Sequence, residues 1–252
     1  MTLDAAFLIS FFAVFIRCTA MLLSSPLYGA VVPVQVRVFG GAVISLAVLP
    51  IVGGHIGPVP ENIVDLIFLA GREAILGVTI GLCLQFMTAA IQIAGSFLDY
   101  QLGIGSAQLF NPNMNGSATP IGQFKFWLSL VLIFVLDAHH LMFQAFVKSF
   151  ALPGFFGGDP GYFVAQVSAL FGQLMMLSIQ IAAPVVAVTV IIDVAAGIIN
   201  KAVPQTQPFL LALPAKLALG MIALSVGLPS VAAGVNAGVR ITFDHMGRLL
   251  GG

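Results

Sequence analysis

The sequence predicts an all-α, integral membrane-type protein of about six long apolar helices. Of its 252 residues, 60% are hydrophobic and only 7% are charged, and the mean hydropathy is +1.10. Soluble domains are about 25% charged, and a soluble fold of this length has too much surface for so few polar groups. Several apolar runs also reach the roughly 20 residues that a transmembrane helix needs.

The charge balance and the two cysteines exclude several classes of function. Nine basic and nine acidic residues give a net charge of zero, so no basic surface for nucleic acid is expected. Cys18 and Cys83 lie in apolar runs without CxxC spacing, which predicts buried, inert thiols. Met1 to Asp4 include no basic residue, so the first run is expected to be a retained helix and not a cleaved signal peptide.

The first two predicted helices are separated by prolines. The first runs from Ala5 to about Ser25, and Pro26, Gly29 and Pro33 break the chain after it. The second, about Val38 to Val52, is short for a full span.

The third predicted helix is too long to cross a membrane upright. The run from about Ile63 to Leu98 would extend about 50 Å, against a hydrocarbon core of roughly 30 Å. It therefore tilts, bends or projects beyond the bilayer. Gly77 and Gly81 form a GxxxG pair, which allows close contact with another helix backbone.

Polar segments divide the second half of the chain. Asp99 to Pro120 is rich in glycine, asparagine and serine, so its backbone must lie in water or against protein and not in lipid. A fourth apolar run, about Ile121 to Val147, contains Lys125, Asp137, His139 and His140.

Two more apolar runs complete the predicted helices. The fifth, about Tyr162 to Ile192, is kinked by Pro184, and the last covers about Ala215 to Val239. The segment from Asp193 to Pro214 mixes polar and apolar residues, and a short, weakly amphipathic tail follows Val239.

Ionisable residues within or beside the apolar runs are the main functional signal. A charge at mid-membrane costs about 2.5–3.5 kcal/mol on insertion scales, so these groups cannot all face lipid. Groups near helix ends could extend to the interface. The alternative is that they pair with one another, with neighbouring subunits or with water in a pore. They are Arg17, Arg72, Glu73, Asp137, Asp193, Lys201 and Lys216.

No motif for catalysis, a cofactor or a metal is present in the sequence. Asp137 and His140 are spaced i, i+3, which is compatible with a proton relay or with a helix cap at a membrane boundary. The HExxH, P-loop and GxSxG patterns are absent from the 252 residues. We therefore expect a protein that is not an enzyme and that binds neither cofactor nor metal.

The order of several short motifs resembles one protein family across the whole chain. Residues 194–220 contain a Pro-Gln pair, an aromatic residue and a P-x-K-x-x-x-G segment. The motif residues are Arg17, Pro26, Gly29, Pro33, Arg37, Glu73, Gly77, Gly81, Gln101, Gly103, Pro112, His140, Pro204, Gln205, Phe209, Pro214, Lys216 and Gly220. In these the chain resembles FliR, a flagellar type III export-gate protein related to the injectisome T component, over a single domain, 1–252. It departs from the family pattern at Ser106, Leu109, Phe110, His139 and Gln207.

This resemblance implies kinked helical hairpins in a hetero-oligomeric pore with FliP and FliQ homologues, near FlhB and FlhA. The pore passes unfolded polypeptides across the bacterial inner membrane at the flagellar basal body. The implied gasket loop contains Gly103, Gly105, Leu109, Phe110 and Pro112. The implied subunit-facing charges are Arg17, Arg37, Arg72, Glu73, Asp193 and Lys216. Structural roles are implied for Pro26, Pro33, Gly77, Gly81, His140, Pro204, Gln205, Pro214 and Gly220.

Alternatives to this interpretation differ in what they predict. Leu109 and Phe110 could anchor their loop in a core instead of sealing a pore. A small secondary transporter or proton channel would also use intramembrane charges and broken helices, but it predicts an inverted repeat, and none is visible. A membrane scaffold would never contact the exported chain. Membership of the flagellar branch is favoured over the injectisome branch.

Overall fold

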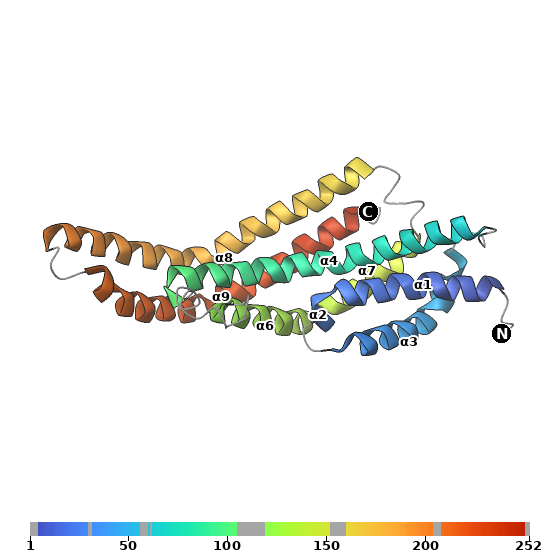
Figure 1. The fold of residues 1–252 in the computed structure, drawn as a ribbon, viewed down its shortest axis with the longest axis horizontal. Helices are drawn as coiled ribbons and strands as arrows, with labels where there is room; N and C mark the ends of the chain where they lie inside the picture. Colours follow the sequence, from blue (N-terminus) through green and yellow to red (C-terminus); the bar gives the residue numbers. More distant parts are fainter. Residues whose placement is uncertain are drawn as a thin grey trace. The chain divides into compact units, whose positions relative to one another are not determined.

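A computed structural model describes residues 5–29, 32–55, 60, 62–104, 119–151, 160–203 and 208–249. All regular secondary structure in these ranges is helical (Figure 1). The all-α prediction is confirmed. Five described helices are long and apolar enough to cross a membrane, or up to six spans if a bent pair of helices counts as one, which is the arrangement of a multi-pass membrane protein.

Ten helical elements follow one another along the described chain. The N-terminal half forms α1 (Ala5–Ser24), α2 (Pro26–Gly29), α3 (Val34–Val52), the 3₁₀ turn η1 (Gly53–His55) and α4 (Ile63–Gln101). The C-terminal half forms α6 (Pro120–Val135), α7 (Ala138–Lys148), the 3₁₀ turn η3 (Ser149–Ala151), α8 (Pro160–Ala202) and α9 (Pro208–Leu249).

Proline and glycine set several of these boundaries. Pro26 and Pro120 are the first residues of α2 and α6, the position where a missing backbone N–H costs no helical hydrogen bond. Pro33 precedes α3 with φ −55° and ψ 147°. Gly103 ends the turn after α4 at φ +81°, and its N–H donates to the Tyr100 carbonyl, a left-handed conformation that glycine adopts without strain.

The fourth apolar run was predicted as continuous, and the structure divides it. α6 ends at Val135 and α7 begins at Ala138, and the two form a bent pair. Asp137, between them, has φ 54° and ψ 21°, in the left-handed region that ends a right-handed helix.

The last two helices are longer than the hydropathy predicted. α8 continues through Asp193 to Ala202, and α9 includes the tail as far as Leu249. Hydropathy alone underestimates such helices because a polar residue on one face does not interrupt backbone hydrogen bonding. In the tail, Thr242, His245 and Leu249 are buried at helical spacing, so this segment has a packed face.

The chain divides into two compact units, each assembled from separate segments. The first comprises Met1–Met87, Ile133–Phe171 and Val239–Gly252. In it, α1 and α3 lie side by side (Figure 1), and the α1–α3 approach is close enough that a Cβ at Gly41 would lie 2.6 Å from Thr19 Oγ1. The second comprises Thr88–Leu132 and Gly172–Gly238.

Candidate functional site

Among the described residues of the first unit, the most buried ion pair is Arg17–Glu73, between α1 and α4. Arg17 Nε donates to Glu73 Oε2 at 2.5 Å, and the two side chains are 2% and 8% exposed. At this degree of burial the carboxylate and the guanidinium stabilise each other, because either group alone would be an unpaired buried charge.

The turn after α7 completes the surroundings of Arg17. Arg17 Nη1 donates a hydrogen bond to Ser149 Oγ at 2.7 Å, and Ser149 Oγ in turn donates to the Phe146 carbonyl at 2.6 Å. The Arg17 Cζ atom lies 3.7 Å from the centroid of the Phe150 ring, a cation–π geometry. One arginine therefore connects α1, α4 and η3.

The GxxxG pair of α4 lies against α1 next to this ion pair. A Cβ at Gly77 would collide with the Arg17 carbonyl oxygen and would lie 2.8 Å from Ala20 Cβ. A Cβ at Gly81 would collide with Ser24 Oγ and would lie 2.6 Å from the Met21 carbonyl oxygen. The glycines permit the close backbone approach that their spacing predicted.

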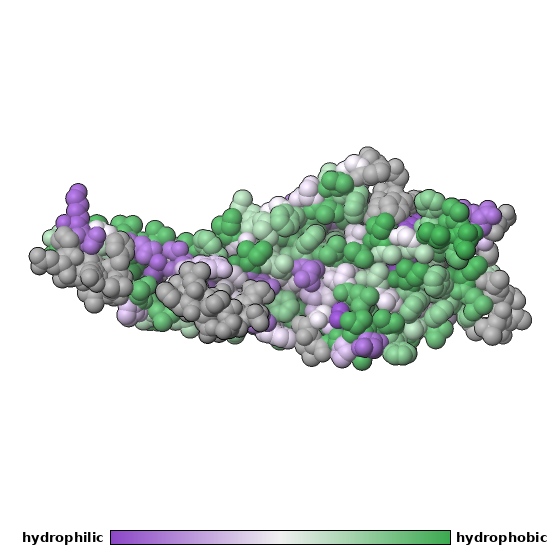
Figure 2. Space-filling model, in the orientation of Figure 1, coloured by the Kyte–Doolittle hydropathy of each residue, from purple (hydrophilic) through white to green (hydrophobic). Residues whose placement is uncertain are grey.

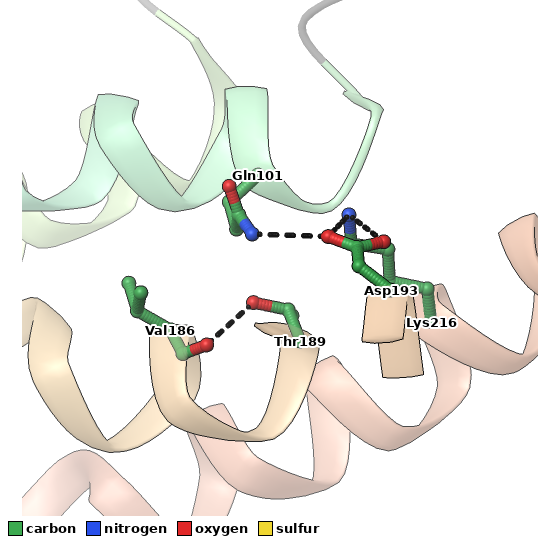
Figure 3. A network of polar contacts seen from close by, with 5 residues as sticks. All are labelled: Gln101, Val186, Thr189, Asp193 and Lys216. Carbon is green, nitrogen blue, oxygen red and sulfur yellow. Dashed lines mark hydrogen bonds and ion pairs between the residues drawn. The ribbon is translucent and has the colours of Figure 1, made fainter. Parts of the chain in front are cut away.

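A second ionic group joins three helices in the second unit (Figure 3). Lys216 Nζ, from α9, donates to both carboxylate oxygens of Asp193, from α8, at 2.8 Å. Gln101, in the last turn of α4, donates through Nε2 to Asp193 Oδ2 at 3.4 Å. The Asp193 side chain is 41% exposed and that of Lys216 is 13% exposed, so one edge of this group is open.

A buried carboxylate at the start of α6 was not anticipated from the sequence. Asp99 is fully buried in α4, and its Oδ2 accepts the backbone N–H groups of Ile121 at 2.8 Å and Gly122 at 3.0 Å. It therefore caps α6 from a different helix. A local pattern could not reveal this, because donor and acceptor are separated by more than twenty residues.

Lys125, one turn further into α6, is also completely buried. Within the described residues its Nζ makes no hydrogen bond. α4 and α6 pack closely here because Gly95 of α4 lies against Gly122 of α6. A Cβ on Gly95 would lie 2.6 Å from the Gly122 Cα.

Sequence-predicted charges divide into two groups in the structure. Arg17 pairs with Glu73 inside the chain, and Asp193 pairs with Lys216. Pairing with one another is one of the alternatives that the sequence left open, and the expected contacts of these four residues with neighbouring subunits stay a prediction. Arg37 is half-buried and donates through Nε to the Val32 carbonyl at 3.1 Å, and Arg72 is half-buried on α4.

The other predicted residues are distributed over both units. Pro26 is buried at the start of α2, Pro33 and Pro214 are exposed, and Gly220 is buried against Leu102. His140 is exposed and lies 3.3 Å from Asp137 Oδ1. Gly103 lies at the end of the described part of its loop. The remaining predicted residues lie outside the described residues: Gly105, Leu109, Phe110, Pro112, Pro204 and Gln205.

Large apolar side chains cover much of the described surface (Figure 2). Phe39 in α3, Phe68 in α4 and Val226 in α9 are 72%, 74% and 77% exposed. In water such surface would cause association, and lipid or other protein is its stable environment. Exposed apolar side chains of this size, together with a buried Arg17–Glu73 ion pair, are unlike the usual arrangement of a soluble protein.

The chain is similar in sequence to known bacterial export proteins. Residues 8–240 match the family described as "Bacterial export proteins, family 1". The flagellar biosynthetic protein FliR of Bacillus subtilis is 33% identical over 249 residues, 96% of this chain and 94% of that protein. FliR of Caulobacter vibrioides is 30% identical over 87% of this chain and 88% of its own. The Yop proteins translocation protein T of Yersinia pestis is 25% identical over 73% and 72%. The chain is a member of the bacterial export proteins, family 1.

Proposed function

We propose that this chain is an export-gate subunit of the flagellar type III secretion apparatus. With FliP and FliQ homologues it forms the pore that passes unfolded polypeptides across the inner membrane, near FlhB and FlhA homologues. The observation that carries the proposal is the match to FliR of Bacillus subtilis over 96% of the chain. The exposed apolar side chains of α3, α4 and α9 supply surface for neighbouring subunits.

Co-expression with FliP and FliQ from the same genome tests the assembly. The three proteins are expected to co-purify in detergent at a fixed stoichiometry, and deletion of this chain should abolish motility. A monomer that transports a small solute on its own would instead support a secondary transporter. A complex that forms only with the injectisome counterparts would move the chain to that branch.

The loop between α4 and α6 is proposed to seal the closed pore. Leu109 and Phe110 are two large apolar side chains in its middle, and an apolar constriction blocks ions by excluding water. Replacing both with glycine should raise ion leak in cells that overexpress the complete complex. Replacing Leu46, an exposed leucine of α3, with glycine is a control outside the loop. Unchanged leak in a fully assembled Leu109→Gly, Phe110→Gly complex would assign the two residues to loop anchoring.

Arg37 and Arg72 are proposed to contact neighbouring subunits. Arg72→Ala should reduce co-purification with FliP and FliQ while the variant chain alone keeps its wild-type expression level. Wild-type assembly and motility in this variant would remove Arg72 from the interface.

A further inference from the structure

Three side chains with metal-binding groups meet where α6 and α7 join. Asp137, His139 and His140 each offer one ligand atom, and these three atoms lie within 4.8 Å of one another. His140 Nδ1 is already 3.3 Å from Asp137 Oδ1. Two ligands at a tetrahedral zinc ion lie roughly 3.3–3.5 Å apart, so the His140–Asp137 pair has the separation required.

The carboxylate of Asp137 is not used as a helix cap. Asp137 occupies the N-cap position of α7 but makes no side-chain hydrogen bond to the helix. Its carboxylate points to the His140 ring instead. The exposed position of both side chains keeps the two ligand atoms accessible to an ion from solution.

His139 supplies an independent observation. Its Nδ1 atom is buried and makes no hydrogen bond within the described part of the chain. The ring is held between Phe134 and His140, with ring centroids 5.1 Å and 4.1 Å away. A buried ring nitrogen without a hydrogen-bond partner is unusual in a folded protein and calls for an explanation.

From this arrangement we infer that Asp137, His139 and His140 bind one Zn²⁺ ion or a similar divalent transition-metal ion. Two imidazoles and a carboxylate suit zinc, whereas Ca²⁺ and Mg²⁺ prefer oxygen ligands. Three protein ligands leave a coordination position open for water or for a group from outside the chain. The bound ion fixes the junction of α6 and α7. This inference is independent of the proposed export function.

Cobalt titration of the full chain tests the site. The protein is purified in detergent without a polyhistidine tag, treated with chelator and titrated with Co²⁺, whose visible absorption reports coordination by nitrogen and oxygen. Zn²⁺ is then added to displace it. The variants are His139→Ala, His140→Ala and Asp137→Gly, and His55→Ala is the matched control because it removes a histidine outside the cluster.

Wild type and His55→Ala are expected to bind one equivalent of Co²⁺ and to release it to Zn²⁺. The His140→Ala and Asp137→Gly variants should bind roughly 100-fold more weakly or worse, since even losing a group behind a ligand costs about 10–100-fold. Glycine tolerates the positive φ of Asp137, and His140 is exposed, so both variants are expected to fold. Absence of stoichiometric binding in wild type, or unchanged binding in these two variants, would overturn the site.

Discussion

At the scale of single residues, burial decides which ion pairs contribute to the stability of the fold. Arg17 and Glu73 are almost inaccessible, and their hydrogen bonds continue to Ser149. Arg248 and Asp244 are joined by a 2.8 Å ion pair of similar chemistry but are 55% and 62% exposed. The buried pair constrains the position of three segments, whereas the exposed pair is screened by solvent.

Substitution of Arg17 by alanine should therefore destabilise the chain by about 3–5 kcal/mol, because Glu73 remains buried without a counter-ion. Arg248→Ala is the control and should cost about 0.5 kcal/mol or less. Denaturation in detergent measures both. An Arg17→Met, Glu73→Leu double variant should recover most of the loss. Equal stability of the Arg17→Ala and Arg248→Ala variants would contradict this account.

At the scale of elements, contact between helix backbones requires glycine at particular positions. Gly77 has the Arg17 backbone carbonyl against it, whereas a Cβ at Gly71 on the same helix would meet nothing within 4 Å. The collision at Gly77 involves backbone, which cannot move aside as the end of a flexible side chain can.

Gly77→Ala should separate α1 from α4 and lower the melting temperature in detergent, because its Cβ would collide with the Arg17 carbonyl oxygen, whereas Gly71→Ala should be neutral or stabilise α4 by up to about 1 kcal/mol. Both variants change a glycine of α4, so the comparison removes general effects of helix substitution. Similar melting temperatures for the two would show that the α1–α4 contact does not depend on Gly77.

The cap between α4 and α6 gives a second prediction at this scale. Asp99→Ala leaves the N–H groups of Ile121 and Gly122 without their acceptor, at a cost of about 1–2 kcal/mol or more. Asp99→Asn keeps one acceptor oxygen and should lose less. Hydrogen exchange at the first turn of α6 measures the effect directly. Equal exchange rates in Asp99→Ala and wild type would exclude this cap.

At the scale of the whole molecule, large apolar side chains cover much of the described surface, and the Arg17–Glu73 ion pair is internal. Cys18 and Cys83 are 0% and 2% exposed, so the wild-type chain should react slowly with a thiol reagent. Labelling of the two native cysteines should therefore contribute little to the signal from a cysteine introduced on the surface.

A cysteine in place of Val226 should react rapidly in the isolated chain, because Val226 is 77% exposed. If the proposed assembly covers α9, the same cysteine should be protected in the complex with FliP and FliQ homologues. A cysteine in place of Arg248 on the same helix is the exposed comparison. Equal labelling of the Val226→Cys variant alone and in the complex would exclude that face from the interface.

The amino-acid sequence by itself determined that the surroundings of the chain are apolar, that its fold is all-helical, and which family it belongs to. Runs of apolar residues, interrupted by Pro26 and Pro33 and by the polar segment after Asp99, predict membrane-length helices because unpaired backbone groups cannot face lipid. The order of the Arg17, Glu73, GxxxG and Lys216 motifs indicated the family. All of these signals are local or depend only on the order of motifs.

Only the tertiary structure decided which polar groups are partners. Three contacts join residues that are more than twenty positions apart in the sequence. They are Arg17 with Glu73, Asp193 with Lys216, and Asp99 with the first turn of α6. Hydropathy also did not predict the break between α6 and α7 at Asp137. One residue with a left-handed conformation changes the direction of the chain without changing the apolar composition of the segment. Pairing over such separations depends on how whole helices pack, which no local pattern records.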